Sequence, residues 1–488
     1  MAEARLKRID RSQSYWGAVE IESLIAPDHR ARGIWELVST LPVEEFLSDN
    51  KSVAGRAGAE RTDPRLLIAV WVYGLTLGIG SARELERQLE REPGLRWLCG
   101  DEGVNHHTLS DFRVAHGAAL DGLFSRVLAA LSTAGLVKLE QLTLDGTKIQ
   151  AQAGASSLRR EPTLRERLRQ AEQVVAELTR EAQEEGARSK RQAARERAAC
   201  EQAARLRQAL EELEAIRKSR QEPEQARASA SEPEARVMKN GQGGFAPSYN
   251  AQTMVDAAHK IVVNVELTQQ AGDQGQLEAA LERLPPRCGD GTLQLLVDGG
   301  YIEERGIAAA AERGVELIGP VLEREVQRSR NQRQSLAQAG IAEEFGGAAF
   351  RVVEDGVALE CPAGQRLRRI SHTPRYDQYR AGAGACGACA MRPRCCPRSA
   401  ARSVKIARPS PVVEAFHQRM REPAAQAVYG LRGAVAEFPH AWWKEKFGLR
   451  KFHVRGLAKA RLELKWAALA YNIQQWFRLI WKPRLATA

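Results

Sequence analysis

Two short apolar runs that each end at an Asp-Gly pair constrain the fold more than any other feature of this chain. The runs are LTL, before Asp145, and LQLLV, before Asp298. Runs of this length and composition are typical of buried β-strands. We expect the first strand over about residues 139–153. An Asp at a strand end before Gly is often only a turn residue, so neither Asp alone indicates a functional site.

The segments between and after these runs predict the rest of a sheet. Two strands joined by a short turn come first, followed by an amphipathic helix, the strand that ends at Asp298, a further helix and a further strand. These elements are expected at residues 249–257, 260–269, 273–284, 292–300, 302–314 and 315–321. This order fits an α+β or α/β fold with a ribonuclease-H-like core, in which the first and fourth strands are neighbours. Asp145 and Asp298 would then lie side by side.

A long charged segment interrupts this core. Residues 163–218 are dominated by Ala, Arg, Glu, Gln and Leu. Apolar residues recur there at three- and four-residue steps, from Leu164 to Ala182 and again from Leu206 to Leu213, with Gly186 between the two runs. This pattern predicts an inserted antiparallel helical hairpin. The alternative is a lone charged helix, since many apolar positions are only Ala.

The N-terminal region, residues 1–135, is expected to be all-helical. Asp63-Pro64 has the pattern of a helix start, and Ser81 with Glu84 has the pattern of a capping box. Thr108 with Asp111 follows the same logic. Two helices around a glycine turn are compatible with a DNA-reading helix-turn-helix, and equally with an ordinary helical bundle.

The overall charge favours a polyanionic partner. The chain of 488 residues has a formal net charge of +11, and such a balance promotes nucleic-acid binding through counterion release. No apolar run is long enough to span a membrane, and the first residues do not resemble a signal peptide. Eight cysteines in such a chain favour metal binding or free thiols in a reducing compartment over disulfides.

A third acidic residue completes a candidate metal site. Glu437 lies in a C-terminal stretch with helical periodicity. Three carboxylates brought together would repel one another, at about 4 kcal/mol per pair at 4 Å and an effective dielectric of 20. Divalent cations would relieve that repulsion, and two Mg²⁺ or Mn²⁺ ions held by Asp145, Asp298 and Glu437 suit phosphodiester chemistry. Taken singly, each acid is more simply a turn residue or a solvated side chain.

Several motifs together resemble the DDE transposases of bacterial insertion sequences. They are DGTK at Asp145, DGGY at Asp298, and Tyr429-x2-Arg432-x4-Glu437-x6-Lys444. HTLSDFR, CPAG, CGAC and the segment after Phe452 resemble the subgroup with a cysteine-rich insertion before the catalytic Glu.

The resemblance implies that Asp145, Asp298 and Glu437 form the catalytic, metal-binding triad and that Tyr429, Arg432 and Lys444 help to hold DNA. The family usually has three residues between the Arg and the Glu, whereas this chain has four. In a regular helix this spacing would place Arg432 and Glu437 about 140° apart. Glu463 is the alternative third acid.

Other residues near these motifs are candidate DNA contacts. Lys148, Arg450, Lys451 and Arg455 would bind phosphates, and Tyr301, Trp442 and Trp443 would pack against DNA or stack a base. The alternatives are solvated lysines and arginines, and aromatic rings buried in the core.

The cysteines predict a structural zinc site. Cys386 and Cys389 have the short chelating spacing, and Cys361 and Cys395 would complete four thiolates, with Cys396 as an alternative fourth ligand. Reduced free thiols and an iron–sulfur cluster remain alternatives. Cys99, Cys200 and Cys288 are isolated and expected to be inert.

The expected organisation follows from these motifs. It comprises a helical DNA-binding domain at 1–135, core segments at 136–158 and 231–320, a helical hairpin at 159–230, a cysteine-rich insertion at 321–410 and C-terminal helices completing the core at 411–488. The implied protein is a cytoplasmic transposase that binds the double-stranded ends of its element as a dimer or larger assembly, cleaves them and joins them to target DNA. The rivals are a catalytically inactive DNA-binding derivative, a general endonuclease and a coiled-coil scaffold.

Overall fold

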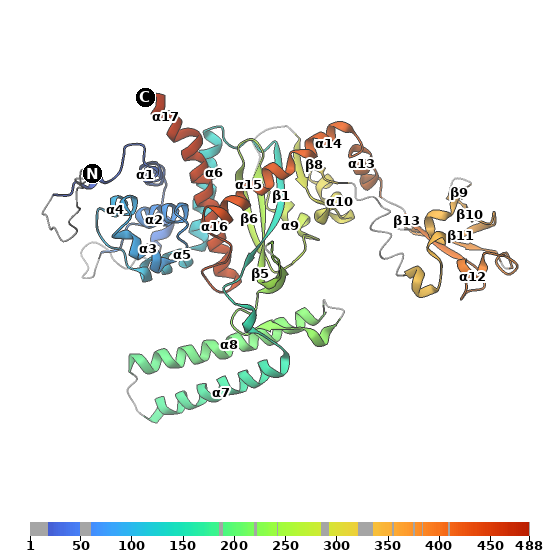
Figure 1. Ribbon diagram of the computed structural model, residues 1–488, viewed down its shortest axis with the longest axis horizontal. Coiled ribbons are helices and arrows are strands. Elements are labelled where there is room, and N and C mark those ends of the chain that lie inside the picture. Colours follow the sequence, from blue (N-terminus) through green and yellow to red (C-terminus); the bar gives the residue numbers. More distant parts are fainter. Residues whose placement is uncertain are drawn as a thin grey trace, which may run out of the picture.

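A computed structural model describes residues 18–48, 60–184, 189–218, 222–241, 243–284, 292–320, 335–353, 356–373, 376–382, 384–407 and 410–487. It is a mixed α and β structure. Figure 1 shows helices from both ends of the chain around a central sheet, with a helical hairpin below this body and a small second sheet to its right.

The central sheet has six strands. They are β1 (Gln141–Gln150), β4 (Arg236–Lys239), β5 (Phe245–Asp256), β6 (Ile261–Thr268), β7 (Leu293–Val297) and β8 (Val315–Ile318). Their order is β4-β5-β1-β7-β8, and β6 also pairs with β5. The pair β5–β6 and the strands β1, β7 and β8 confirm the predicted strands, whereas β4 was not predicted.

The register of β1 against β7 sets the level of the two aspartates. The two strands are parallel, and Leu144 lies opposite Val297. Asp145 follows Leu144, and Asp298 follows Val297. The pairing of the two strands therefore brings both aspartates to the same level, where β7 ends. The predicted adjacency of the first and fourth strands is therefore confirmed, and its cause is ordinary parallel pairing of two Leu- and Val-rich runs.

The C-terminal helices pack against this sheet. They comprise α13 (Pro411–Arg419), α14 (Pro423–Gly430), α15 (Arg432–Glu445), α16 (Leu457–Trp476), a π-helical turn (Phe477–Trp481) and α17 (Lys482–Thr487). Helix α15 contacts β1 and β5, and α16 contacts β6. Two shorter helices, α9 (Gln276–Glu282) and α10 (Glu304–Glu312), pack on each other, and α10 contacts β8. Most of α16 is buried, including its apolar run from Trp466 to Tyr471 and the polar residues Glu463, Asn472, Gln474 and Gln475.

The N-terminal region is helical, as predicted. Its helices are α1 (Arg30–Thr40), α2 (Pro64–Thr76), α3 (Ala82–Leu89), α4 (Pro93–Cys99), α5 (His106–Ala115) and α6 (Gly117–Thr133). Helices α2, α5 and α6 pack against α16, so one hydrophobic core runs from Ile25 to Trp481. These helices therefore share their core with the sheet.

The predicted helix starts are partly right. Asp63 accepts a hydrogen bond from the Arg65 backbone N–H, as an N-cap does. Helix α3 begins after Ser81, but the Ser81 hydroxyl forms no cap hydrogen bond. The start predicted at Thr108 is wrong, because Asn105 caps α5 by accepting from the Thr108 backbone N–H.

In the part of the chain that the structure describes, no single helix is long and apolar enough to cross a membrane. Helices α5 and α6 together reach the required length and composition, but they are bent by 78° at their junction.

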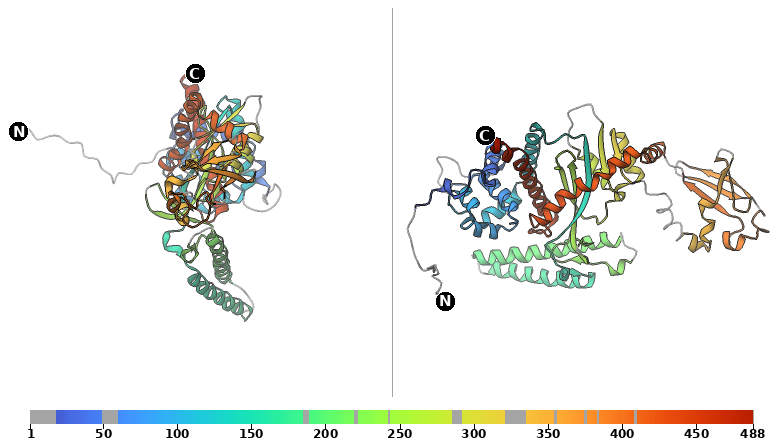
Figure 2. Two further views of the ribbon diagram at one scale, coloured as in Figure 1. Left: turned by 90° about the vertical axis from the view of Figure 1, so that its right-hand side faces the viewer. Right: turned by 45° about the horizontal axis from the view of Figure 1, so that its top comes forward.

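The charged segment forms the predicted hairpin. Helices α7 (Glu161–Glu184) and α8 (Lys190–Lys218) pack against each other around their own small core, which includes Leu164, Leu206 and Leu213. The turn predicted at Gly186 lies outside the described residues. Strands β2 (Leu158–Arg159) and β3 (Ala228–Ser229) pair and close the base of the hairpin, which extends away from the sheet in Figure 2.

A second, smaller unit follows β8. Its five strands are β9 (Arg351–Val353), β10 (Ala358–Glu360), β11 (Arg366–His372), β12 (Tyr376–Ala381) and β13 (Ser403–Ala407), in the order β13-β12-β11-β10-β9. The short helix α12 (Arg392–Cys395) precedes β13. This cysteine-rich module has a hydrophobic core of its own, around Leu359, Leu367 and Tyr379.

Candidate active site

Asp145 and Asp298 meet at a single guanidinium group. Arg432 Nη2 donates to Asp145 Oδ1 at 2.9 Å and lies 3.6 Å from Asp298 Oδ2. The side chains of Arg432 and Asp145 are only 13% and 15% exposed, and that of Asp298 is 38% exposed. These two carboxylates and the guanidinium form a small anionic site where β7 ends beside its neighbour β1.

Helix α15 supplies the cationic side of this site. Arg432 is its first residue, directly after the break at Leu431 that separates α14 from α15. His440, two turns further on, places Nδ1 3.8 Å from Asp145 Oδ2, and its Nε2 is 3.0 Å from the hydroxyl of Thr253 on β5. The helix thus lies across β1 and β5 with Arg432 and His440 directed at Asp145.

Burial controls the protonation of these groups. Burial raises the pKa of Asp145 to about 6, although the charge of Arg432 opposes this shift and the charges of Asp298 and Asp273 add to it. Burial also lowers the pKa of His440 to about 3, and the cations Lys444 and Arg432 lower it further. His440 is therefore neutral at pH 7 and adds no positive charge to the site.

Glu437 does not join the two aspartates in this structure. Its side chain is exposed, on a part of α15 about 140° around the axis from Arg432 at 3.6 residues per turn. Among the described residues, no three His, Cys, Asp or Glu side chains stand close enough together to hold a metal ion as they are placed. The structure thus brings together two of the three predicted acids, with Arg432 between them.

Sequence reasoning missed a further acidic residue beside the site, Asp273. Its Oδ1 accepts hydrogen bonds from Asn250 Nδ2 at 3.0 Å and from Gln252 Nε2 at 2.9 Å, and it lies 3.9 Å from Lys148 Nζ. Gln252 in turn accepts a hydrogen bond from the Tyr301 hydroxyl. Asp273 lies in a polar loop before α9, and only its three-dimensional contacts distinguish it.

The glycine after Asp145 is required by this packing. A Cβ on Gly146 would lie 2.5 Å from Asp273 Oδ1 and 2.7 Å from Gln252 Nε2. We expect Gly146→Ala to lower the free energy of unfolding by about 1–3 kcal/mol, the usual cost of overpacking. Urea unfolding followed by circular dichroism measures the change.

Gly433 provides the matched control, because the atom nearest to its added Cβ is Glu437 Oε1 at 3.9 Å. Gly433→Ala, within α15, should stabilise by about 0.5–1 kcal/mol through helix propensity. Equal stability of Gly146→Ala and the parent chain would show that the side chains of Asp273 and Gln252 can move to make room for the added methyl group.

Basic residues predicted to contact DNA continue from the site along the end of β1. Lys444 is partly buried and donates to the Thr147 hydroxyl at 2.5 Å. Lys451 is exposed beside Gln150, with which it forms a β-bridge. Arg450 and Arg455 are also exposed, and Arg450 pairs with Glu445.

The predicted aromatic contacts need correction. Tyr301 and Trp443 are fully buried, so neither presents a ring to DNA, and the alternative of core packing holds for both. Trp442 is partly buried, packs against Phe438 and lies under the guanidinium of Arg478. Tyr429 is partly buried on α14.

Glu463 has a structural role, so it is wrong as a fallback third acid. Its carboxylate is 2% exposed and accepts hydrogen bonds from the backbone N–H groups of His453, at 3.0 Å, and Val454, at 3.2 Å. Arg113 lies 3.8 Å away. These contacts fix the chain before α16 and leave Glu463 enclosed.

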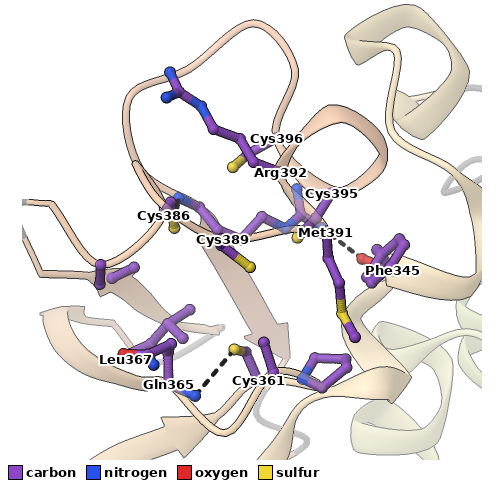
Figure 3. Close-up of a pocket in the computed structure, with 15 residues that line it drawn as sticks. Phe345, Cys361, Gln365, Leu367, Cys386, Cys389, Met391, Arg392, Cys395 and Cys396 are labelled. Atoms are coloured by element: carbon purple, nitrogen blue, oxygen red, sulfur yellow. Dashed lines mark hydrogen bonds between the residues drawn. The ribbon is translucent and has the colours of Figure 1, made fainter.

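The cysteine-rich module gathers its thiols around one pocket. Cys361, Cys386, Cys389, Cys395 and Cys396 all line it. Figure 3 shows Cys361 on one side, with the other thiols across the pocket. The thiols of Cys361, Cys386 and Cys389 are near enough to that of Cys395 to raise its pKa, although burial contributes more. The sequence predicted that Cys361, in CPAG, would lie near Cys386 and Cys389, in CGAC. Cys99 is buried, Cys200 is exposed, and Cys288 lies outside the described residues.

A buried arginine lies beside these thiols. Arg402 is 8% exposed, its Nη2 donates to the Phe345 carbonyl at 2.8 Å, and its backbone N–H donates to Cys386 Sγ at 3.4 Å. Its Nε has no hydrogen-bond partner among the described residues. Burial lowers the pKa of Arg402, while Cys395, Cys396 and Cys386 raise it. A buried cation next to thiols favours their thiolate form.

Comparison with known families gives two matches. A family described as a transposase DDE domain matches residues 360–477, and a family described as a transposase domain (DUF772) matches residues 19–115. The first match includes Glu437 and the five clustered cysteines but begins after Asp145 and Asp298. No curated protein matches the sequence.

Both matched families are transposase domains, one at each end of the chain. Together the two matches indicate a DDE transposase of an insertion sequence, the family that the motifs around Asp145, Asp298 and Glu437 resemble.

Proposed function

We propose that this chain is an active DNA transposase that binds the ends of its insertion sequence, cleaves them and transfers the cut strands to target DNA. One observation carries the proposal: Asp145 and Asp298, from neighbouring parallel strands, share a single cationic group. These would be two of the three carboxylates that a DDE transposase needs at its cation site.

The sheet supports a ribonuclease-H-like core. Strands β6, β5, β1, β7 and β8 have consecutive antiparallel pairings up to β1 and parallel pairings from β1 onward. Of this arrangement, the sequence predicted that the first and fourth strands are neighbours. The hairpin lies between β1 and β4 in the sequence, and the cysteine-rich module lies between β8 and α13. In open sheets of this kind, ligands bind at the carboxyl ends of the parallel strands, where Asp145 and Asp298 lie.

The candidate site fits divalent cations. Asp145 and Asp298 offer the oxygen ligands that Mg²⁺ and Mn²⁺ prefer, and Arg432 already places a positive charge between them. We propose Glu437 as the third ligand, which must turn inward from its exposed position. When bound, the two metal ions supply an activated water or hydroxyl and neutralise charge on the scissile phosphate. Asp145 must lose its proton first, so binding weakens below about pH 6.

DNA would approach along the basic residues beside the site. Lys444 donates to the Thr147 hydroxyl, and Lys148 lies near Asp273. Arg450, Lys451 and Arg455 are exposed beyond β1. Tyr429 and Trp442 remain candidate contacts, because both are partly accessible. These cations would neutralise phosphates and so bind DNA in a salt-dependent way.

The proposed activity has a direct test. Purified protein in Mn²⁺ should nick duplexes that carry the inverted repeats flanking its gene, and should join the resulting 3′-hydroxyl ends to plasmid DNA. A dimer or larger assembly should form on paired ends, as expected for a cytoplasmic enzyme that must hold two ends together. Binding of end DNA without any strand cleavage would instead identify a catalytically inactive DNA-binding derivative.

We also propose that the module binds a structural zinc ion through Cys361, Cys386, Cys389 and Cys395, which line one pocket and would have to draw closer together around the ion. Four thiolates would carry excess negative charge, and the buried guanidinium of Arg402 offsets part of it. The site would stabilise a module whose own core is small.

The zinc proposal predicts about one zinc ion per chain by mass spectrometry of the native protein. Cys389→Ser should release it and lower the unfolding temperature, whereas Cys200→Ser, on the exposed face of α8, should retain it. Full zinc content in Cys389→Ser would contradict this ligand set, and iron in place of zinc would indicate a cluster.

A further inference from the structure

One face of the five-stranded sheet carries positive charge without acidic partners. The five strands hold six Arg and Lys side chains and two acidic ones, Glu360 and Asp377. Both acids are already engaged: Glu360 pairs with Arg351 at 3.0 Å, and Asp377 lies 2.6 Å from His372 Nδ1 and 3.9 Å from Arg369. Among the described residues, no acid forms an ion pair with Arg368, Arg380 or Lys405.

Two of these cations face each other directly. Arg368 on β11 and Arg380 on β12 are partners in the antiparallel register, so their side chains project from the same face with Cβ atoms about 5 Å apart. Both residues are exposed, and no ion pair with an acid is formed by either within the described part of the chain. Like charges directly opposite each other destabilise a sheet.

Lys405 extends the same surface to a third strand. Arg380 pairs with Ser403, and Lys405 lies two residues beyond Ser403 on β13, so both β13 side chains share the face of Arg380. Lys405 stands over the ring of Tyr376, 4.7 Å from its centroid. Adjacent strands lie about 4.8 Å apart, so the three cations span roughly 10 Å across β11, β12 and β13.

The opposite face of the sheet packs against the core of the module. Leu367, Tyr379 and Val404 point into the core of the module, which also packs around the cysteines. Because alternate residues of a strand face opposite sides, this burial fixes Arg368, Arg380 and Lys405 outward. The module therefore displays one apolar face to its own core and one basic face to its surroundings.

We propose that this basic face, defined by Arg368, Arg380 and Lys405, is a second DNA-binding surface that contacts the phosphate backbone away from the candidate active site. The inference rests on the proposed transposase function, which supplies duplex DNA as the partner. A closely spaced row of cations without acidic partners is complementary to a polyanion. In Figure 1 the module extends beyond α13 and α14, so it would reach DNA outside the site.

The test compares two double variants of equal charge. In Arg368→Gln with Arg380→Gln, the unpaired arginines are lost. In the control, Arg351→Gln with Arg394→Gln, each lost arginine is one that pairs with a Glu, Glu360 or Glu344. Fluorescence anisotropy with a long duplex that contains an element end gives the affinity at several KCl concentrations.

We expect the Arg368 and Arg380 variant to reduce the slope of log K against log [KCl] by about 1.8, because each phosphate contact contributes about 0.9. Affinity at low salt should fall about tenfold, and the control should remain close to the parent. Parent-like slope and affinity in the variant would overturn the proposal.

The same samples separate this inference from the proposed function. If the parent protein cleaves end DNA in Mn²⁺ and the variant keeps the parent slope, the second surface is refuted and the transposase function stands. If the slope falls but no protein cleaves DNA, the surface stands and the proposed catalysis fails.

Discussion

Asp145→Asn should bind end DNA like the parent protein and lose strand cleavage by roughly a hundredfold to a thousandfold or more, the usual cost of removing one charged group from a reacting centre. Asn is nearly isosteric with Asp and can still accept a hydrogen bond from Arg432, which lies 2.9 Å from Asp145 Oδ1. The fold should therefore persist while the charge that holds a cation is gone. Gel assays of nicked and strand-transfer products in Mn²⁺ measure the effect.

Asp101→Asn is the matched control. Asp101 follows α4 and pairs with Arg96 at 2.7 Å, in the N-terminal helical region and outside the group around Asp145. Its replacement removes the same charge and should leave cleavage within about twofold of the parent, as is usual for surface substitutions. Parent-like cleavage by Asp145→Asn would show that the two strand-end aspartates are not the site.

Arg432→Gln should raise the affinity of the DNA-free protein for Mn²⁺ or Ca²⁺ by at least about tenfold, while cleavage falls. The guanidinium lies 2.9 Å from Asp145 and 3.6 Å from Asp298, so it competes with any cation for the same carboxylates. Two unit charges 4 Å apart interact by about 4 kcal/mol at an effective dielectric of 20, which leaves room for an effect of this size. Titration calorimetry with Ca²⁺, which avoids turnover, measures it.

Arg450→Gln tests whether the higher metal affinity expected for Arg432→Gln depends on the position of Arg432 or only on the loss of one positive charge. Arg450 is exposed, pairs with Glu445 and lies just beyond α15. It should change metal affinity by less than about twofold, because exposed charges at a distance are screened. Weaker metal binding in Arg432→Gln would mean that the arginine orders the carboxylates for the metal instead of competing with it.

The strands and the hairpin follow from patterns that act locally. LTL and LQLLV are apolar because β1 and β7 lie inside the sheet, and Leu144 opposite Val297 then fixes where Asp145 and Asp298 meet. The periodic leucines of α7 and α8 are likewise the residues that pack between the two helices. In these elements the pattern of apolar residues that predicts the structure is also the pattern that is buried when the structure forms.

The finer details of the site depend on contacts between distant segments. The spacing of Arg432 to Glu437 departs from the family pattern, yet Arg432 is the residue that contacts both aspartates. The extra residue turns Glu437 away from Arg432 on α15, where it is exposed. Sequence periodicity reports the angle between two residues of a helix, but not which of them faces the sheet.

Burial of single aromatic and acidic residues was equally hard to predict. Trp442 and Trp443 are adjacent, but only Trp443 turns fully into the core. Asp273 lies in a loop whose composition is ordinary, and its importance arises from Asn250 and Gln252 on β5, which hold its carboxylate. Such roles are set by tertiary packing.

A crystal structure of the protein with Mn²⁺, examined by anomalous scattering, tests the central claim most directly. The claim predicts a peak bound by Asp145 and Asp298, with the guanidinium of Arg432 moved off both carboxylates and Glu437 turned toward the ion. Peaks only elsewhere, with Arg432 still joining the two aspartates at saturating Mn²⁺, would contradict it.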